Sequence, residues 1–443
     1  MEARLRPWLK KSELERIDEL VERYGQADPS EVPALVADFV RQSEELNDRV
    51  CLNLYAGTNV MDPQARMFAH STISSRPSLG QPGNKYEMGL QHAEALEVLC
   101  LSLARRIFGC SYVEFRVFSG GMANLYAYMT LANPGDTILT LPERAGGHAT
   151  HRTYGAAGLY GLRVVDIPWS DEEMMVDLER LADVAAREYP RIILIGSSLM
   201  LFPFPLAQIR EIADSVGAKV VYDAAHVSGL VAGKAFQQPL REGAHILTCS
   251  TYKSLGGPPG GLLLTNDADI AERVERVAYP GLTANFDLGR IAALTVTLAG
   301  FLQFGEAYAQ MMRANARELA HALDGEGLPV VAQRHGFTQS HHVALSMQDF
   351  GGGTHASRKL EESLILASGI EVPGEGVEGD YNGLRLGTQE VTRWGMQPVD
   401  MGWIGRAIGD RLLGRRSASD IRADVRKFRA GFQKLHFVLD GEF

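Results

Sequence analysis

Residues 246–261 read ILTCSTYKSLGGPPGG: a short apolar run, then hydroxyl-bearing residues, a lysine, and a turn rich in glycine and proline. The run Ile246–Cys249 has the length and composition of a strand that is buried on both faces. Lys253 follows the end of this strand, where burial lowers the pKa of an amine enough for it to form a Schiff base. Because a surface lysine rarely lies in so constrained a run, Lys253 is our candidate for an imine-forming lysine.

The same pattern of short apolar runs continues on either side of this stretch. We predict strands at Ile192–Ile195, Val220–Tyr222 and Leu262–Leu264, with helices at Leu206–Val216 and Asp267–Val277 among them. Near-continuous apolar strands that alternate with helices are typical of a mostly parallel sheet covered on both faces. In such a sheet, ligands bind at the carboxyl ends of the strands, so polar residues directly after apolar runs are the first candidates for a site.

The rest of the chain predicts further regions around this sheet. Residues 10–48 have the spacing of two amphipathic helices, which we assign to an N-terminal helical arm over 1–50. We expect a large α/β domain over 51–300, from which a helical stretch at roughly 288–324 leads into a small C-terminal α+β domain over 301–443. The elements expected in this last domain are strands near Val343–Ser346 and Gly383–Leu386 and a basic helix at 418–437.

Composition excludes several classes of partner. The 443 residues carry a formal net charge of −10. An acidic surface without a dense basic patch does not favour the binding of a nucleic acid or an anionic membrane. The four cysteines lack metal-type spacing, so we expect a reduced protein without a metal site. Residues 1–16 match neither a signal peptide nor a membrane anchor, and we expect a cytoplasmic protein.

Two groups of polar residues follow predicted strands. Ser119-Gly120-Gly121 opens a helix after an apolar run, and paired glycines at a helix N-terminus let backbone amides approach a phosphate. Asp223 ends the strand at Val220–Tyr222, with His226 three residues on. A buried carboxylate is costly unless it meets a cation, and a protonated pyridine nitrogen is one such cation. Taken alone, the two groups also fit a tight turn and a strand-end cap.

Two more side chains complete the pattern. His148 lies on a glycine-containing loop after a predicted strand, where it could stack on an aromatic ring, and Arg385 lies within an apolar strand, where an arginine usually has a carboxylate partner. An imine-forming lysine, an aspartate for a ring nitrogen, a stacking histidine, a phosphate-binding turn and a carboxylate-binding arginine are what pyridoxal 5′-phosphate (PLP) and an amino acid need. We therefore predict a PLP enzyme that acts on a small α-amino acid.

The chain also resembles serine hydroxymethyltransferase and its aldolase and threonine transaldolase relatives over nearly its whole length. The motifs that carry the resemblance are REIADSVGA at 210–218, YDAAHVSGL at 222–230, the Lys253 segment and RLGT at 385–388. This resemblance implies a fold-type I, aspartate aminotransferase-like PLP enzyme with a mostly parallel, seven-stranded sheet in its large domain. It also implies a homodimer whose sites are formed across the two subunits.

Position by position, the resemblance implies a role for each candidate residue. Lys253 forms the Schiff base, Asp223 meets the pyridine nitrogen, His226 lies beside the cofactor's hydroxyl group, and His148 stacks on the ring. The residues implied around the rest of the cofactor and the substrate are Gly120, Gly121 and Ser250, Gly281 at the neighbouring subunit's phosphate, and Arg385 and Tyr86 at the amino acid.

Several positions depart from the family's pattern. Leu79 stands where those enzymes carry a glutamate that handles protons and meets folate, and Pro77 and Glu87 stand where they carry tyrosines. The other departures are Glu143 and Ala149 in place of leucines beside the pteridine, and Gly57 in place of a serine near the substrate carboxylate. Because a leucine cannot transfer a proton, we expect no standard use of folate. Glu87 and His148 remain as candidates for the general base.

The segment 336–342 contains two adjacent histidines, His341 and His342. Together with Arg385 and residues 387–396, this segment resembles the threonine transaldolase-type relatives. Successive residues of a strand point to opposite faces, so at most one of the two histidines can face the site.

These observations predict a PLP-dependent enzyme that makes or breaks the Cα–Cβ bond of a β-hydroxy-α-amino acid by an aldol or retro-aldol route, of the α-methylserine or threonine type. A folate-dependent serine or α-methylserine hydroxymethyltransferase is the alternative. Threonine transaldolation, transamination and racemisation stay open as well, because a fold does not determine a function. A catalytically silent scaffold is disfavoured by the presence of both Lys253 and Asp223.

Overall fold

The computed structural model describes residues 6–439, and the chain divides into two units between Cys51 and Leu52. The N-terminal unit contains α1 (Lys11–Tyr24) and α2 (Val32–Glu44), followed by a π-helical turn at Glu45–Val50. The rings of Tyr24 and Phe39 join the two helices, with centroids 5.0 Å apart. Both helices predicted for this region are therefore present.

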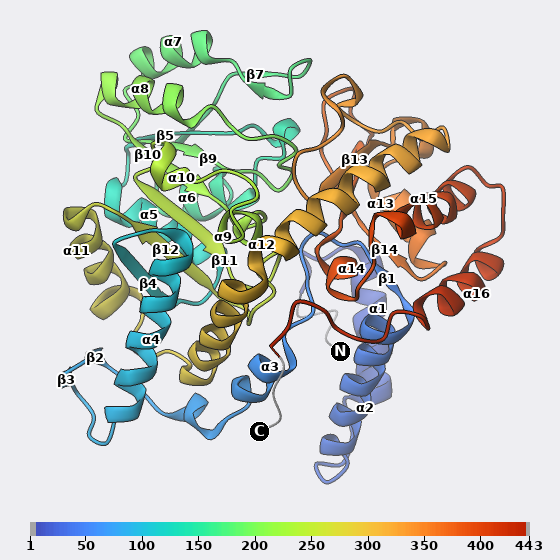
Figure 1. The fold of residues 1–443 in the computed structure, drawn as a ribbon, viewed down its shortest axis with the longest axis horizontal. Helices are drawn as coiled ribbons and strands as arrows, with labels where there is room; N and C mark the ends of the chain where they lie inside the picture. The colour runs from blue at the N-terminus through green and yellow to red at the C-terminus, as the bar shows by residue number, and fades with distance from the viewer. Residues whose placement is uncertain (1–5, 440–443) are drawn as a thin grey trace. The chain divides into compact units, whose positions relative to one another are not determined.

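The larger unit is built around a seven-stranded sheet (Figure 1). In spatial order its strands are β4 (Tyr112–Val117), β12 (Gly261–Thr265), β11 (Ile246–Ser250), β10 (Lys219–Asp223), β9 (Ile192–Ile195), β5 (Thr137–Thr140) and β6 (Arg163–Asp166). Neighbouring strands are parallel from β11 to β6, whereas β12 is antiparallel to both β11 and β4. The predicted mostly parallel, seven-stranded sheet is confirmed.

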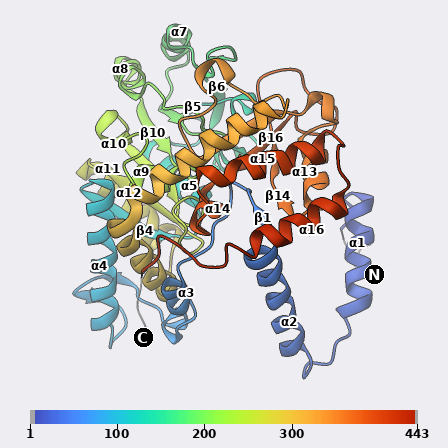
Figure 2. The ribbon, with the colours of Figure 1, turned by 45° about the vertical axis from the view of Figure 1, so that its right-hand side comes forward.

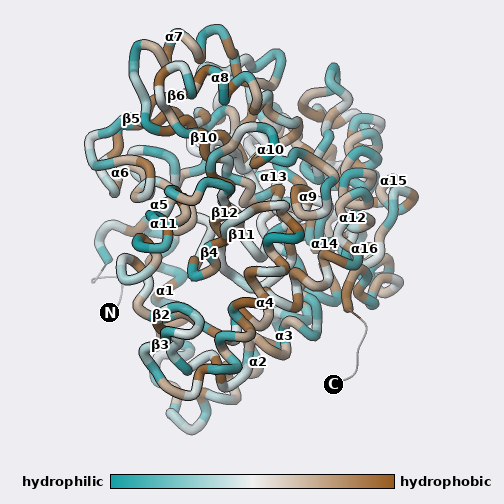
Figure 3. The backbone as a smooth tube through the Cα atoms, turned by 60° about the vertical axis from the view of Figure 1, so that its left-hand side comes forward, coloured by the Kyte–Doolittle hydropathy of each residue, from teal (hydrophilic) through white to brown (hydrophobic). Residues whose placement is uncertain are grey.

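Successive residues of these strands alternate between two hydrophobic cores, one on each face of the sheet. Leu247 of β11 and Leu262 of β12 belong to one core, while their neighbours Ile246 and Leu263 belong to the other. The helices whose residues complete the first core include α4 (Gln91–Phe108), α7 (Leu178–Glu188) and α8 (Leu206–Val216), and those of the second include α5 (Gly120–Leu131) and α11 (Ala268–Arg276). Figure 3 shows the mixed hydrophilic and hydrophobic positions along α7 and α8 that such covering helices require.

One long helix, α12 (Leu288–Gly325), runs from the large sheet to the C-terminal elements (Figure 2). By length and composition α12 could cross a membrane, but 72% of its most apolar window is buried inside the structure, so it serves here as a core helix. It matches the helix predicted at roughly 288–324. The domain boundary expected at residue 300 falls inside α12 rather than in a loop.

The C-terminal elements form a second, antiparallel sheet and a group of helices. The sheet has the order β13 (His342–Ser346), β16 (Gly383–Gly387), β15 (Ser368–Ile370), and the helices are α13 (Gly353–Glu361), α14 (Gln389–Arg393), α15 (Pro398–Leu412) and α16 (Ala418–Arg429). The basic helix predicted over 418–437 is thus shorter, because Gly431 follows its last turn.

Short elements connect these parts. They are β1 (Leu52–Asn53) paired with β14 (Ile365–Leu366), α3 (Pro63–Ala69), the hairpin of β2 (Gly80–Gln81) and β3 (Asn84–Lys85), α6 (Ala156–Leu159), the pair β7 (Trp169–Ser170) and β8 (Met175–Val176), α9 (Ser228–Ala232) and α10 (Pro239–Glu242).

Candidate active site

Lys253 lies in the loop that follows β11, and only 8% of the residue is exposed. Its Nζ is 3.0 Å from Nε2 of His226. Burial lowers the pKa of Lys253 to about 8, although the nearby carboxylate of Asp223 opposes this shift. At physiological pH the amine is therefore much closer to its neutral, nucleophilic form than an exposed lysine would be.

Asp223 ends β10, the strand next to β11, and its carboxylate is buried. One oxygen, Oδ2, accepts a hydrogen bond from Asn124 Nδ2 at 2.8 Å and lies 3.1 Å from His151 Nε2, while Oδ1 accepts the backbone N–H of Ala225 at 2.8 Å. Burial raises the pKa of Asp223, but the interactions with His151, Ala225 and Asn124 outweigh it and bring the pKa to about 2. The carboxylate is therefore ionised and available to a cationic group of a ligand.

A glycine turn lies beside these two residues, at the start of α5. Ser119 caps the helix by accepting the backbone N–H of Met122 at 3.1 Å. A Cβ at Gly120 would overlap the hydroxyl of Ser250, so this position admits no side chain without displacing that hydroxyl. Gly120 and Ser250, both predicted to contact the cofactor, thus meet at a helix N-terminus, where backbone amides and the helix dipole favour an anion.

His148 lies on the loop after β5, as the sequence predicted. It lines the same cavity as Lys253 and Asp223. Burial lowers the pKa of His148 to about 4, so its ring is neutral at physiological pH. Its Nδ1 lies 2.9 Å from Oγ1 of Thr150, and its ring meets that of His151 edge-on, with centroids 6.0 Å apart.

Arg385 reaches the pocket from β16 of the C-terminal sheet and is 6% exposed. Its guanidinium donates to the backbone carbonyl of Ser198 and, at 3.2 Å, to Oγ of Ser368, whereas its Nε has no hydrogen-bond partner among the described residues. Burial lowers the pKa of Arg385 to about 10, a value at which it still carries its charge at neutral pH. No carboxylate lies within 4.0 Å of this cation in the described chain, which leaves its charge available to a substrate carboxylate.

Two adjoining cavities join these residues into one site. The first is lined by the glycine turn, Asn124 and Asp223, and the second by Arg385, Tyr55 and Tyr381. The residues that line both are His148, Ser198, His226, Tyr252 and Lys253. The structure thus places the predicted cofactor half and the predicted substrate half of the site side by side.

Three predicted site residues lie outside both cavities of their own chain. Tyr86 follows the β2–β3 hairpin and is 79% exposed, and the carboxylate of Glu87 accepts the backbone N–H of Leu79 at 3.0 Å. Gly281 lies in the turn that follows α11. None of the three therefore lines the cavities that contain Lys253.

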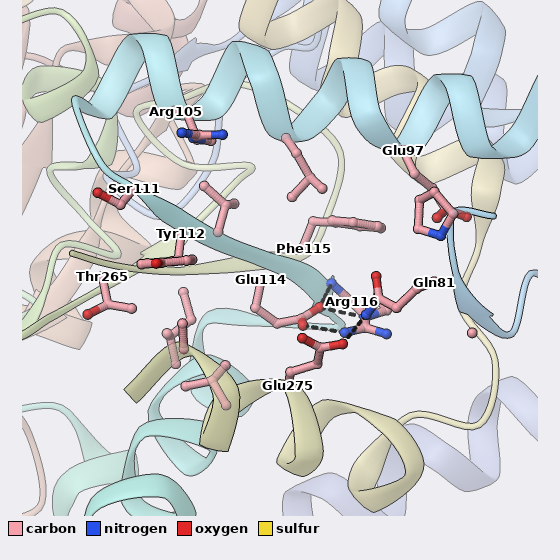
Figure 4. A pocket seen from close by; sticks show the side chains of 17 residues that line it. Gln81, Glu97, Arg105, Ser111, Tyr112, Glu114, Phe115, Arg116, Thr265 and Glu275 are labelled. Atoms are coloured by element: carbon pink, nitrogen blue, oxygen red, sulfur yellow. Dashed lines mark hydrogen bonds and ion pairs between the residues drawn. The ribbon is translucent and has the colours of Figure 1, made fainter. Parts of the chain in front are cut away.

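A separate hollow lies between the β2–β3 hairpin, α4, β4 and α11 (Figure 4). Several polar side chains at this hollow are paired: Arg116 with Glu114 at 2.7 Å, Gln81 with Glu275, and Glu97 with Lys85 at 2.7 Å. Arg105 lines the hollow as well. The hollow shares no lining residue with the two cavities around Lys253. In the described part of the chain, no group of three or more His, Cys, Asp or Glu residues is arranged to bind a metal ion.

The sequence did not reveal several residues that support the site. Behind Asp223, His151 Nδ1 lies 2.7 Å from the hydroxyl of Tyr128, and Oδ1 of Asn124 accepts the hydroxyl of Thr248 at 2.8 Å. The spacing His148-Ala-Thr-His151 was the only available signal for the second histidine. Nothing local in the sequence shows that the loop turns this ring toward β10.

The seven-stranded sheet and the lysine at the end of a buried strand define the fold-type I, aspartate aminotransferase-like class. The structure of L-threonine transaldolase from Pseudomonas fluorescens, in its internal aldimine state, superposes with a TM-score of 0.84 at 23% identity and covers 92% of this chain and 94% of that one. The family model of serine hydroxymethyltransferase matches residues 29–408. The chain belongs to the serine hydroxymethyltransferase family.

Similar curated proteins include alpha-methylserine aldolases and serine hydroxymethyltransferases. An alpha-methylserine aldolase from Ralstonia is 45% identical over 433 residues, 98% of this chain and 99% of that protein. One from Variovorax paradoxus is 49% identical over 412 residues, 92% of each chain. A serine hydroxymethyltransferase from Methanopyrus kandleri is 40% identical over 406 residues, 91% of this chain and 95% of its own.

Proposed function

We propose that this chain is a PLP-dependent aldolase that cleaves and forms the Cα–Cβ bond of α-methylserine, with alanine and formaldehyde as the products of cleavage. The observation that carries the proposal is one pocket that combines a readily neutralised amine, Lys253, with an ionised carboxylate, Asp223, and a buried guanidinium without a carboxylate partner, Arg385. The names of the relatives at 45–49% identity support the choice of substrate.

The residues of the pocket fit PLP. Lys253 would hold the cofactor covalently, Asp223 would pair with its ring nitrogen, and His148 would stack on its ring. The N-terminus of α5, where the missing side chain of Gly120 leaves the hydroxyl of Ser250 in place, suits the cofactor's phosphate. When bound, PLP supplies the electron sink for the α-carbon of the amino acid.

The chain's own residues would orient the substrate and move the protons. Arg385 would bind the α-carboxylate and so fix which substituent of Cα is cleaved. A base must take the proton of the β-hydroxyl group as formaldehyde leaves. His148 is one candidate because its ring is neutral, and Glu87 of a neighbouring subunit is the other.

Folate is not required in the proposed reaction. Leu79 cannot carry a proton, and its backbone N–H is bound by the carboxylate of Glu87. Direct cleavage releases formaldehyde and does not pass it to an acceptor. The reaction therefore does not need the glutamate that the folate-dependent relatives carry at the position of Leu79.

We also propose a cytoplasmic homodimer whose subunits complete each other's sites. Tyr86, Glu87 and Gly281 lie outside the pocket of their own chain, although the family resemblance assigns them to the site. Tyr86 and Met88 are 79% and 86% exposed, and two neighbouring large side chains this exposed favour burial against another surface. A second copy of the chain would provide that surface.

The first experiment is formaldehyde and alanine release by the PLP-loaded chain from α-methylserine, with serine, threonine and phenylserine as comparison substrates and with tetrahydrofolate present or absent. Release from α-methylserine without folate supports the proposal. Release of another aldehyde, from threonine or phenylserine alone, contradicts the choice of substrate but leaves the bond cleavage in place.

A second candidate is a folate-dependent hydroxymethyltransferase acting on serine or α-methylserine. It is favoured by the 40% identity to the Methanopyrus kandleri protein of that name. The same experiment separates the two functions, because turnover that requires tetrahydrofolate would establish the second and exclude the first.

A further inference from the structure

Gly57 leaves a space that the phenol ring of Tyr55 fills. A Cβ built at Gly57 would lie 2.7 Å from Cζ of Tyr55 and 2.8 Å from its hydroxyl oxygen, which is closer than a side chain can approach without a shift. The backbone of Gly57 has no positive φ that would itself call for glycine. The position therefore admits no side chain unless the ring of Tyr55 moves, and the glycine is what lets the ring lie there.

The ring of Tyr55 borders the part of the site that we assign to the substrate. Tyr55, Gly57 and Arg385 line one cavity together with Lys253. The guanidinium carbon of Arg385 lies 6.0 Å from the centre of the Tyr55 ring. Burial lowers the pKa of Arg385, and the nearby phenol of Tyr55 raises it. The two side chains are thus neighbours at the same cavity.

The backbone that carries Tyr55 is fastened to the strand that carries Arg385. The carbonyl of Leu54 accepts the N–H of Gly387, two residues beyond Arg385 in β16, at 2.7 Å. The side-chain amide of Gln389 donates to the carbonyl of Tyr55 at 2.8 Å. These bonds fix the backbone of Tyr55 relative to Arg385, so the two side chains can act on one ligand as a pair.

The hydroxyl group of Tyr55 is available to a ligand. Within the part of the chain that the structure describes, Tyr55 forms hydrogen bonds only through its backbone N–H and carbonyl. Two of the three guanidinium nitrogens of Arg385 already donate to Ser198 and Ser368. The two oxygens of a carboxylate can accept about four hydrogen bonds, so a carboxylate bound by Arg385 can accept another from a neighbouring donor.

We propose that Tyr55 is a substrate-binding residue whose hydroxyl group donates a hydrogen bond to the α-carboxylate of the amino acid, beside Arg385. This assignment deepens the proposed function and rests on it for the identity of the substrate. An uncharged donor strengthens binding at a buried cation without adding a second charge that must lose its water. A carboxylate held at two points cannot turn freely, so Tyr55 helps Arg385 to fix which substituent of Cα is cleaved.

Gly57 has an indirect part in this arrangement. It is one of the positions at which the chain departs from the family's pattern, where the resemblance implies a serine near the substrate carboxylate. The missing side chain makes room for the phenol, whose hydroxyl oxygen lies 2.8 Å from the place of the absent Cβ. The glycine supplies the space and the tyrosine supplies the donor, so Gly57 is a positioning residue for Tyr55.

The test measures the binding of two probes to the full chain loaded with PLP. One probe is 2-methylalanine, which is α-methylserine without its hydroxyl group, and the other is isopropylamine, which also lacks the carboxylate. The change in cofactor absorbance gives both dissociation constants. We expect Tyr55→Phe, which keeps the ring, to weaken 2-methylalanine binding by roughly tenfold to a hundredfold, the scale of one hydrogen bond to a charged group. The binding of isopropylamine should not change.

Tyr189→Phe is the matched control, since Tyr189 lies at the end of α7, is 71% exposed and lines neither cavity of the site. Unchanged binding of 2-methylalanine in Tyr55→Phe would overturn the proposal. An equal loss for isopropylamine would overturn it as well, because the hydroxyl group would then act on the amine or the cofactor and not on the carboxylate.

A second variant covers the case in which Tyr55→Phe does not fold. Gly57→Ala places a methyl group where the ring of Tyr55 lies, so the ring must move and 2-methylalanine should bind more weakly by a similar factor. Binding as tight as in the unmodified chain would contradict the assignment. In the double variant the loss should not exceed that of Tyr55→Phe alone, because one hydrogen bond cannot be lost twice, and losses that multiply would overturn the proposal.

These measurements are independent of the proposed reaction. Neither probe carries a β-hydroxyl group, so neither can undergo the proposed cleavage, and both can be titrated whether or not the aldolase assay succeeds. If the role of Tyr55 is wrong, the probe constants show it while the cleavage of α-methylserine stands. If the proposed substrate is wrong, the assay shows it while the probe constants stand.

Discussion

The Nε2 atom of His151 lies 3.1 Å from the Oδ2 atom of Asp223, and both side chains are closed to solvent. Tyr128 holds the other nitrogen of the histidine at 2.7 Å. The aspartate that the proposed cofactor needs as an anion is thus kept ionised by a residue that lines neither cavity of the site.

Replacement of His151 by phenylalanine should raise the pKa of Asp223 from its value of about 2. The ionised form is then lost at a higher pH on acidification, so the acid limb of the pH–rate profile should move upward. A hydrogen bond to a charged group contributes about 1.5–3 kcal/mol, which corresponds to a shift of the acid limb by roughly one to two pH units. Tyr128→Phe keeps the imidazole and should show a smaller effect. An unmoved acid limb in His151→Phe would contradict this role.

Lys253→Ala should abolish the absorbance of lysine-bound cofactor and the borohydride-stable cofactor–lysine adduct. In the unmodified chain, the rate of cofactor capture should rise with pH and level off above about 8, because the neutral amine predominates above the lowered pKa of Lys253. Lys427→Ala, on the exposed side of α16, is the control and should behave as wild type. A rise that continues to about pH 10.5, the ordinary lysine pKa, would show that Lys253 is not perturbed.

Arg385→Ala should raise KM for α-methylserine by a factor on the order of 10², as expected for the loss of a charge-assisted contact in a buried site. Arg385→Lys keeps the charge but loses the planar fork, so it should recover only part of the affinity. Steady-state kinetics measures both variants, with Arg422→Ala of α16 as a surface control. If KM is unchanged in Arg385→Ala, the carboxylate binds elsewhere.

Gly120→Ala should weaken PLP binding by roughly tenfold to a hundredfold, because the new methyl group displaces the hydroxyl of Ser250 from the phosphate site. Gly402→Ala, on α15, is the control and should have little effect, since its Cβ would meet no atom within 4 Å. Equilibrium titration of the cofactor-free chains measures the difference. Equal affinities for the two variants would remove Gly120 from the phosphate site.

A mixture of Lys253→Ala and Glu87→Gln chains tests whether the site is shared between subunits. Each variant alone should be nearly inactive. Random re-pairing makes half of the dimers mixed, and each mixed dimer has one intact site, so about a quarter of wild-type activity should return. If no activity returns, Glu87 serves the site of its own chain, and if Glu87→Gln alone stays active, Glu87 serves neither site. Sedimentation of the mixture confirms that dimers have formed.

Local patterns predicted much of the large sheet. Ile192–Ile195 and Leu206–Val216 match β9 and α8 residue for residue, because an unbroken apolar run between turns and a helical period are both properties of neighbouring residues. The antiparallel direction of β12 was not predicted. Strand direction is decided by pairing with β4 and β11, and nothing within Gly261–Thr265 encodes those partners.

The residues of the candidate site also fall into those that local patterns predicted and those that they did not. Lys253, Asp223 and Arg385 were found because each is a charged residue in or directly after an apolar run, an arrangement that is costly unless it has a use. His151 lies in a loop and Tyr128 on a helix, both of ordinary composition. Their role depends on the loop bringing His151 to Asp223 of β10, which no local pattern in the sequence shows. Tyr86, Glu87 and Gly281 could be assigned from the family resemblance alone.

The antiparallel pairing of β11 with β12 also restrains the loop that carries Lys253. This loop begins after Ser250 and ends before Gly261, and these two residues are paired in the sheet. Within this loop, Thr251 bonds to the backbone of Gly260, Gly257 and Pro258. Arg385, by contrast, comes from β16 of the separate C-terminal sheet. The amine and the guanidinium of the site are therefore held by two different sheets, so their separation depends on how the C-terminal sheet packs against the loops of the large one.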